Sequence, residues 1–150
     1  DLQARLFADA VRRYGSEEEA SKWVLPKDIS IEGHAIQARV YAEDPKRFFP
    51  SPGKLTIFRP PTSKNIRVET GYAQGRDVTP FYDPMIAKVI AYENTREQAI
   101  LSLKEALKEF EIVGVKNNIP ALLQVLDSSE FKGGKIHTNS LSEIMTKNNN

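Results

Sequence analysis

Apolar residues recur at helical spacing over the first fourteen residues of the chain. This period predicts a helix, with Asp1 as its cap and Gly15 at its end. Ser16 and Glu19 then form the pattern of a capping box, which predicts a short second helix that runs to about Trp23. The apolar stripe of the first helix consists of Leu2, Leu6, Ala10 and Tyr14.

The middle of the chain has the two-residue period of β-strands. Residues 34–42 alternate without a break, so one set of side chains faces a core and the other faces away from it. Short apolar stretches separated by Pro and Gly predict further strands at Lys54–Phe58, Ile66–Thr70 and Met85–Tyr92. Several short strands joined by turns favour an antiparallel sheet. The core-facing set of the first strand is Ile36, Ala38, Val40 and Ala42.

The last third of the chain is mainly helical. Thr95 and Gln98 form another capping box, which opens an amphipathic helix. A last strand at Glu111–Val115, a helix that begins at Ile119 and a small terminal helix near Leu141–Met145 follow. The whole pattern predicts an α+β fold, with helices flanking a mostly antiparallel β-sheet in a single domain. We expect that domain to extend over residues 1–146, with 147–150 as a frayed tail.

Composition and charge narrow the classes of function. The 150 residues carry 21 Lys+Arg and 20 Asp+Glu, so a formal net charge of +1 gives no field that would attract nucleic acid or an anionic membrane. Cysteine is absent, which excludes disulfides, thiolate nucleophiles and Cys-ligated zinc. No apolar run approaches the ~20 residues that cross a bilayer. Because the sequence opens on Asp1 without Met or a leader, we expect a non-secreted fragment of a longer chain.

Arg39 is the strongest candidate for chemistry. It lies in the middle of the first predicted strand, between the small residues Ala38 and Val40, on the face opposite the apolar set. A rigid strand suits a guanidinium that must meet a negative charge at a fixed place. Spacing alone favours the alternative, a surface arginine paired with a neighbour or a cross-strand acid.

Two other polar groups have simpler structural explanations. Asp83 precedes Pro84 at the entrance to an apolar strand, where it could hold an arginine in place or merely form a turn. The adjacent acids Glu43 and Asp44 point to opposite faces of a strand, so turn formation is favoured over a metal site. His34 and His137 are too far apart in sequence to indicate a metal pair. We expect no metal site in this chain.

Four ordered stretches of the sequence are GHAIQARVYAEDP (33–45), FPSPGKL (49–55), RVET (67–70) and YDPMIAK (82–88). Together they resemble the C-terminal domain of biotin carboxylases, the ATP-grasp enzymes found in acetyl-CoA, pyruvate, propionyl-CoA and methylcrotonyl-CoA carboxylases. The resemblance extends from Asp1 to about His137.

The resemblance implies an activity for the whole enzyme. Such a ligase uses ATP, Mg²⁺ and bicarbonate to make carboxyphosphate, and then carboxylates biotin on a biotin carboxyl carrier protein. A carboxyltransferase partner selects the final acceptor, for example in fatty acid biosynthesis. The ATP-grasp and N-terminal domains, with the nucleotide and metal ligands, precede Asp1 in this family, so we expect the fragment alone to be inactive. The family implies a homodimer in the cytoplasm, or in the mitochondrial matrix of a eukaryote.

The resemblance also implies roles for five residues. Arg39 matches the catalytic arginine that faces biotin and stabilises its enolate-like ureido oxygen. Asp83 matches an aspartate near that site, which we expect to orient the arginine. Arg67 matches a residue at the two-fold dimer interface, and Ile136 and His137 match tail positions that close over the adenine.

Two other hypotheses stay open on the sequence. The chain could be a non-catalytic interaction module of the same domain family, which an ATP-cleavage assay dependent on biotin and bicarbonate would distinguish. It could also be a free-standing nucleotide- or RNA-binding module, although the near-neutral charge and the lack of clustered Lys and Arg on the strands oppose this.

Overall fold

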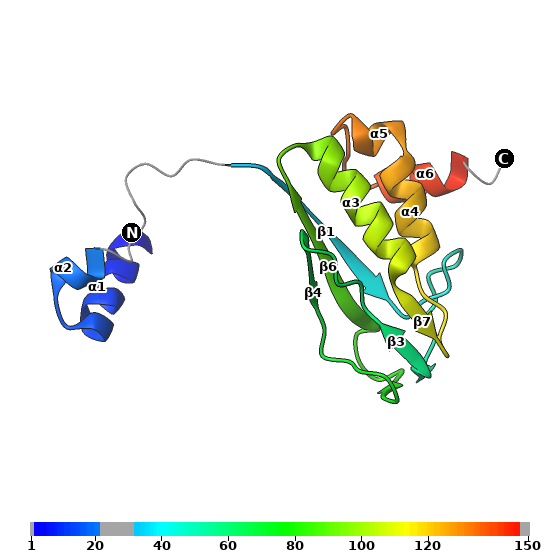
Figure 1. Cartoon of the computed structure of the whole chain (residues 1–150), viewed down its shortest axis with the longest axis horizontal. Helices are drawn as coiled ribbons and strands as arrows, with labels where there is room; N and C mark the ends of the chain where they lie inside the picture. The colour runs from blue at the N-terminus through cyan, green and yellow to red at the C-terminus, as the bar shows by residue number, and fades with distance from the viewer. Residues whose placement is uncertain (1, 22–31, 148–150) are drawn as a thin grey trace. The chain divides into compact units, whose positions relative to one another are not determined.

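The computed structural model describes residues 2–21 and 32–147, with side chains from residue 7 onward in the first of these segments (Figure 1). The chain forms two compact units, Asp1–Glu32 and Gly33–Asn150. The predicted cap Asp1, the expected helix end near Trp23 and residues 148–150 of the predicted tail lie outside the described residues.

The first unit contains two helices in contact, α1 (Leu2–Tyr14) and α2 (Glu17–Ser21). Arg12 and Arg13 lie in the last turn of α1, where they interact favourably with the negative end of the helix. The Glu19 N–H donates to Ser16 Oγ at 3.2 Å, which confirms the N-terminal half of the predicted capping box.

The second unit packs helices against antiparallel β-structure, which confirms the predicted α+β fold. Its main sheet has the strand order β1-β6-β4, and two-stranded ribbons pair β2 with β5 and β3 with β7. The domain bounds 1–146 stay a prediction. The strands are β1 (His34–Tyr41), β2 (Gly53–Lys54), β3 (Ile57–Arg59), β4 (Ile66–Glu69), β5 (Asp77–Val78), β6 (Met85–Glu93) and β7 (Glu111–Val113). The helices are α3 (Arg96–Glu109), α4 (Ile119–Asp127), α5 (Ser129–Lys132) and α6 (Ser140–Lys147).

Helices α3 and α4 lie over one face of the main sheet and form the core with it (Figure 1). The predicted capping box opens α3, because Thr95 Oγ1 accepts from the Gln98 N–H at 3.3 Å. The Phe58 and Phe110 rings meet edge to face, with centroids 5.1 Å apart, and close the core at the β3–β7 ribbon. The core positions predicted on the first strand, Ile36, Ala38, Val40 and Ala42, are all buried. The apolar residues along the amphipathic helix α3 and at its end are buried too; they are Ile100, Leu103, Leu107 and Phe110.

One predicted strand, Lys54–Phe58, is wrong as a continuous element. The chain changes its pairing partner there: the Leu55 N–H donates to the Arg76 carbonyl at 2.9 Å, whereas the Thr56 N–H donates to the Val113 carbonyl at 2.8 Å. Leu55 itself is fully buried. Apolar periodicity cannot show such a change, because it records which face is buried and not which strand lies alongside.

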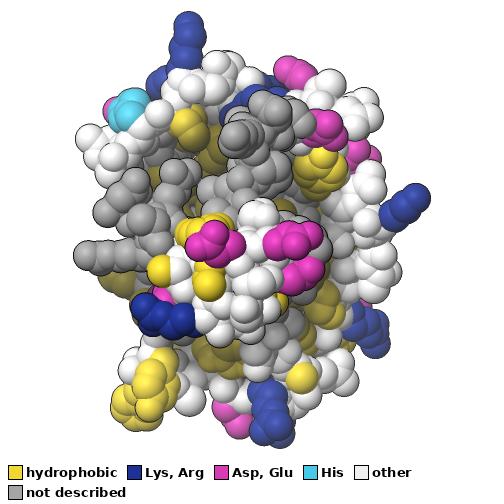
Figure 2. Space-filling model, turned by 90° about the vertical axis from the view of Figure 1, so that its left-hand side faces the viewer, with side chains coloured by type: hydrophobic (Ala, Val, Ile, Leu, Met, Phe, Trp, Pro, Cys, Tyr) yellow, Lys and Arg dark blue, Asp and Glu magenta, His cyan; other side chains and the backbone are white. Residues whose placement is uncertain are grey.

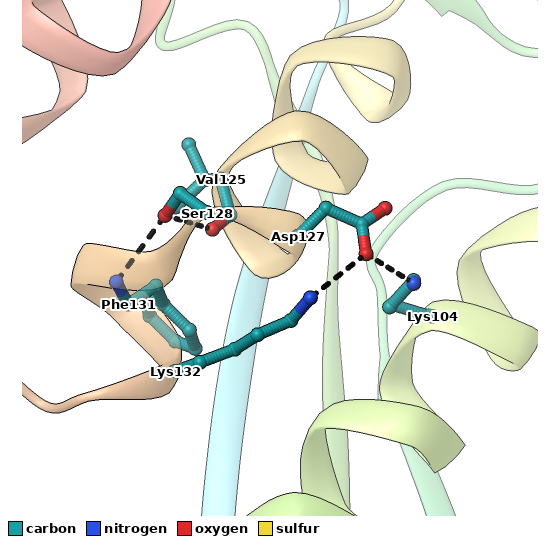
Figure 3. A network of polar contacts seen from close by, with 6 residues as sticks. All are labelled: Lys104, Val125, Asp127, Ser128, Phe131 and Lys132. Atoms are coloured by element: carbon teal, nitrogen blue, oxygen red, sulfur yellow. Dashed lines mark hydrogen bonds and ion pairs between the residues drawn. The ribbon is translucent and has the colours of Figure 1, made fainter.

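The junction between α4 and α5 is held by polar contacts (Figure 3). Ser128 caps α5, since its Oγ accepts from the Phe131 N–H at 3.2 Å. Asp127 Oδ1 forms ion pairs with Lys104 Nζ of α3 at 2.5 Å and with Lys132 Nζ at 3.4 Å. The two lysines lower the pKa of the Asp127 carboxyl, Lys104 most strongly, so the junction and α3 are linked by charge as well as by apolar packing.

Candidate functional site

Arg39 lies on the face of the main sheet opposite the helices. The burial of β1 alternates strictly, so Ala38 and Val40 point into the core while Arg39 is exposed. In the antiparallel register Arg39 stands opposite Lys88 of β6, and Lys88 stands opposite Glu69 of β4. The sheet therefore places these three side chains in one row across its outer face.

Two cations, Lys88 and Arg67, share one carboxylate on this part of the sheet. Glu69 binds Lys88 Nζ at 2.9 Å and Arg67 Nε at 3.3 Å. Lys88 and then Arg67 lower the pKa of Glu69, so this carboxylate is already neutralised by its neighbours. Within the described part of the chain no carboxylate pairs with the Arg39 guanidinium. Arg39 is thus a rigidly mounted cation beside a second cation, available to an anionic ligand.

Asp83 forms the turn that begins β6. Its Oδ1 accepts from the Met85 N–H at 2.8 Å, while the Pro84 carbonyl accepts from the Ala42 N–H at 2.8 Å. These bonds are those of the turn that Asp-Pro favours. Among the described residues no hydrogen bond joins Asp83 to Arg39. Its role in orienting the arginine stays a prediction.

Glu43, for which the sequence favours only a role in a turn, follows the end of β1. Burial raises the pKa of the Glu43 carboxyl above its ordinary value, and the negative charge of Asp83 raises it further. The two residues are forty positions apart, and the pairing of β1 with β6 brings them together. No sequence signal marks this contact, since it depends on the register of the two strands.

The predicted turn at Asp44 is confirmed. Asp44 Oδ1 accepts from the N–H groups of Lys46 and Arg47, both at 3.0 Å, and Oδ2 binds Lys116 Nζ at 2.8 Å. These bonds, that to Lys116 above all, hold the pKa of Asp44 far below its usual range. Within residues 2–21 and 32–147, no group of three or more His, Cys, Asp or Glu side chains could hold a metal ion.

The residues predicted to contact adenine lie on a different element from Arg39. Ile136 and His137 are exposed in the connection between α5 and α6. The His137 N–H donates to Ser140 Oγ at 2.8 Å, and His137 Nε2 lies 3.5 Å from Glu143. This pair stands apart from the row of Arg39, and its role toward a nucleotide stays a prediction.

Arg67 projects from β4 on the outer face of the sheet, beside the Arg39 row. Its guanidinium is exposed apart from its contact with Glu69, and its role at a dimer interface stays a prediction.

Basic side chains stand singly over the surface drawn in Figure 2. The part of the chain that the structure describes contains no helix long and apolar enough to cross a membrane.

Comparison with known proteins gives a consistent result. The family profile for the biotin carboxylase C-terminal domain matches residues 37–143. Biotin carboxylase 2 of Bacillus subtilis is 49% identical over 117 residues, which cover 78% of this chain and 26% of that protein. The mitochondrial methylcrotonoyl-CoA carboxylase subunit alpha of Rattus norvegicus is 40% identical, over 78% of this chain and 17% of that protein.

A solved structure agrees with this match. The biotin carboxylase domain dimer of Hydrogenobacter thermophilus 2-oxoglutarate carboxylase, in complex with MgADP, ADP and bicarbonate, superposes with a TM-score of 0.77 at 35% identity. The superposition covers 86% of this chain and 30% of that one. The chain therefore spans about a quarter of the length of the first curated relative, and it belongs to the biotin carboxylase C-terminal domain family.

Proposed function

We propose that this chain is the C-terminal part of a biotin carboxylase and that Arg39 is its catalytic residue toward biotin. The observation that carries the proposal is the setting of Arg39: exposed on a paired strand, beside Lys88, and without an anionic partner in the described residues. A guanidinium keeps its charge at every physiological pH and presents its N–H donors in a fixed plane.

The chemistry explains why such a group is needed. Biotin becomes a nucleophile when its ureido nitrogen loses a proton, and negative charge then develops on the ureido oxygen. A donor already fixed at that oxygen stabilises this charge without having to reorganise during the reaction. The nitrogen, whose proton passes to a base outside this chain, then forms the C–N bond to the carboxyl carbon of carboxyphosphate as the C–O bond to phosphate breaks and phosphate leaves, while Arg39 holds the oxygen. Lys88 adds positive potential beside Arg39 although its own ammonium binds Glu69.

The remaining requirements of the reaction belong to the longer enzyme. ATP, Mg²⁺ and bicarbonate are its other reactants and cofactor, in line with the MgADP and bicarbonate named for the related 2-oxoglutarate carboxylase domain. The described residues contain no cluster that fits Mg²⁺, so the proposal assigns the ion to no residue here. Ile136 and His137 are proposed to close over the adenine, and Asp83 to support the biotin site.

The proposed partners follow from the same assignment. Biotin arrives on a carrier protein, the N-terminal and ATP-grasp domains of the same enzyme supply the nucleotide site, and a carboxyltransferase receives the carboxyl group. Arg67 is proposed to lie at a homodimer interface, as the exposed outer face of β4 would permit. The proposed location is the cytoplasm, or the mitochondrial matrix if the source is eukaryotic.

Substitution of Arg39 in the full-length enzyme tests the proposal. Arg39→Ala and Arg39→Lys should each lower biotin carboxylation, because lysine keeps the charge but loses the planar pair of donors. Loss of one preorganised donor costs about 10²–10³ in rate. Bicarbonate-dependent ATP cleavage without biotin should change much less, since the proposed phosphate and metal ligands lie outside this chain. Arg59→Lys is the matched control, an exposed strand arginine that is paired with Glu111 at 2.7 Å.

Two outcomes would contradict the assignment. If both Arg39 variants retain biotin carboxylation within a few-fold of the Arg59→Lys control, Arg39 is an ordinary surface residue. If biotin carboxylation and biotin-independent ATP cleavage fall by the same factor, Arg39 acts on the structure of the enzyme and not on the ureido oxygen.

A further inference from the structure

The Asn118 side chain binds the backbone of β1 at the position of Arg39. Its Nδ2 donates to the Arg39 carbonyl at 3.1 Å, and its Oδ1 accepts from the Tyr41 N–H at 2.9 Å. The Asn118 N–H donates to the Tyr41 carbonyl at 3.1 Å. Asn118 is buried, with 8% of its surface exposed, so these bonds are shielded from water. One asparagine therefore satisfies three backbone groups of the strand.

This use of Asn118 departs from what its place in the chain predicts. Asn118 is the N-cap residue of α4, where an asparagine side chain ordinarily accepts from the first turn of the helix. Here the side chain makes no capping bond. Asn117 serves the start of the helix instead, with Oδ1 accepting from the Ile119 N–H at 3.1 Å. The side chain of Asn118 is thus committed to β1 and not to its own helix.

The bonds fall where β1 most needs support. One edge of β1 pairs with β6, and no strand pairs with its other edge within the described residues. The Asn118 amide binds the Arg39 carbonyl and the Tyr41 N–H as the N–H and C=O of one residue in a neighbouring parallel strand would. The register with β6 also shifts between Val40 and Tyr41. Such irregularities change the direction of nearby side chains, so an added constraint there fixes where Arg39 points.

We propose that Asn118 is a positioning residue for Arg39: it holds the backbone of residues 39–41 so that the guanidinium meets the ureido oxygen of biotin. This inference rests on the proposed function of Arg39. A displacement of about 1 Å at a reacting centre can lower the rate by about 10²-fold. Asn118 binds the backbone carbonyl of Arg39 itself, so loss of this bond should have a measurable effect on the rate.

The test uses the full-length enzyme and three variants. Asn118→Ala removes both side-chain bonds. Asn118→Asp, which has nearly the same shape, keeps the acceptor for Tyr41 but loses the donor to the Arg39 carbonyl. Asn117→Ala is the matched control, since it removes a bond to α4 and none to β1. Each variant is assayed for biotin carboxylation, for biotin-independent ATP cleavage and for amide hydrogen exchange over residues 39–42.

We expect a loss confined to one partial reaction. Asn118→Ala should lower biotin carboxylation by about 10- to 100-fold while biotin-independent ATP cleavage stays within about twofold of the control. Asn118→Asp should show the same separation even if Asn118→Ala fails to fold. Exchange of the Tyr41 amide should be faster in Asn118→Ala and unchanged in Asn117→Ala. In an Arg39→Lys enzyme, Asn118→Ala should cost little more, because the group it positions is already lost.

Three results would overturn the positioning role. They are an equal fall of both partial reactions, an unchanged Tyr41 exchange rate in Asn118→Ala, and a full additional loss in the Arg39→Lys enzyme. Failure of the proposed function has a different signature. In that case Arg39→Lys alone leaves biotin carboxylation intact, and the exchange rate at Tyr41 decides by itself whether Asn118 holds β1.

Discussion

Successive residues of each strand point to opposite faces of the β1-β6-β4 sheet, and the two faces differ in their side chains. The face toward α3 and α4 carries apolar side chains in register, such as Ala38 opposite Val89 and Val89 opposite Val68, except for the polar pair His34 and Glu93 at its end. The outer face, one residue along each strand, carries the row of Arg39, Lys88 and Glu69. The inner face stabilises the fold, and we propose that the outer face works on a ligand.

Substitutions on the two faces should therefore change different properties of the protein, its stability or its reaction. A change on the inner face acts on the free energy of unfolding, because buried apolar contacts provide most of that energy. A change on the outer face leaves the unfolding free energy nearly constant and acts on the reaction. Paired substitutions, one on each face, therefore test whether the two faces differ in this way.

The largest effect is expected from a charge placed on the inner face. Ala38→Asp buries a carboxylate without a partner and should lower the free energy of unfolding by about 3–5 kcal/mol. Gln37→Asp, one residue earlier and on the exposed face, should change it by less than about 0.5 kcal/mol. Chemical denaturation of the two variants measures both values. Equal destabilisation would show that the two faces do not differ in this way.

The next effect concerns the clamp between α4 and β1. Asn118→Ala leaves the Tyr41 N–H and the Arg39 carbonyl without their partner, and each buried group left unsatisfied costs about 1–3 kcal/mol. Asn117→Ala should cost about 0.5–2 kcal/mol, the usual effect of a lost cap. Thermal and urea unfolding of the two variants compare the costs. If Asn117→Ala proves the more destabilising, the bonds to β1 contribute less than the helix cap.

A much smaller change in stability is expected at Arg39. Arg39→Ala removes an exposed side chain with no ion pair in the described residues, so the free energy of unfolding should stay within about 0.5 kcal/mol of the original. The same variant should lose biotin carboxylation, as proposed above. Denaturation curves measured beside the activity assay make the comparison. Destabilisation in parallel with the loss of activity would assign Arg39 to the fold.

The smallest effect is a pH dependence at the end of β1. Because the pKa of Glu43 is raised in the folded protein, the folded state holds this proton more tightly than the unfolded state. Stability from this group is present below the unfolded pKa and is lost as the pH rises through the folded pKa. Asp83→Asn removes a repelling charge and should lower the Glu43 midpoint, followed by NMR of its carboxyl carbon.

Asp77→Asn is the control for that titration. Asp77 lies on β5, in a different ribbon from Glu43, and this variant should leave the Glu43 midpoint in place. An unchanged midpoint in Asp83→Asn as well would leave burial as the sole cause of the raised pKa.

Much of the inner face could be predicted from the sequence. The alternation in residues 34–42 predicts both the strand and its buried set, because burial and side-chain direction share one period. The capping boxes at Ser16 and Thr95 predict helix starts, since their bonds are local. The continuous strand at Lys54–Phe58 was wrong because its two halves pair with partners far along the chain.

Less of the candidate site than of the inner face could be predicted from the sequence. Spacing places Arg39 on the exposed face, but its proposed role rests on the resemblance to a family and not on the residues alone. The sequence did not predict Lys88 or Asn118 as site residues, nor the interaction of Glu43 with Asp83, because each depends on pairing or packing between distant segments. The polar pattern of an exposed face carries no period that would identify such partners.

The pairing of distant strands also affects how the chain folds. β1 and β6 join His34 to Glu93, and β3 and β7 join Ile57 to Val113, so the main ladders close only after long intervening loops are ordered. Closing such loops costs entropy before any contact compensates for it, and chains dominated by distant pairs fold on the order of milliseconds to seconds. A nascent chain released before Val113 has no partner for Ile57–Arg59. We expect that intermediate to expose an apolar strand edge, and to need protection from aggregation until β7 has been synthesised.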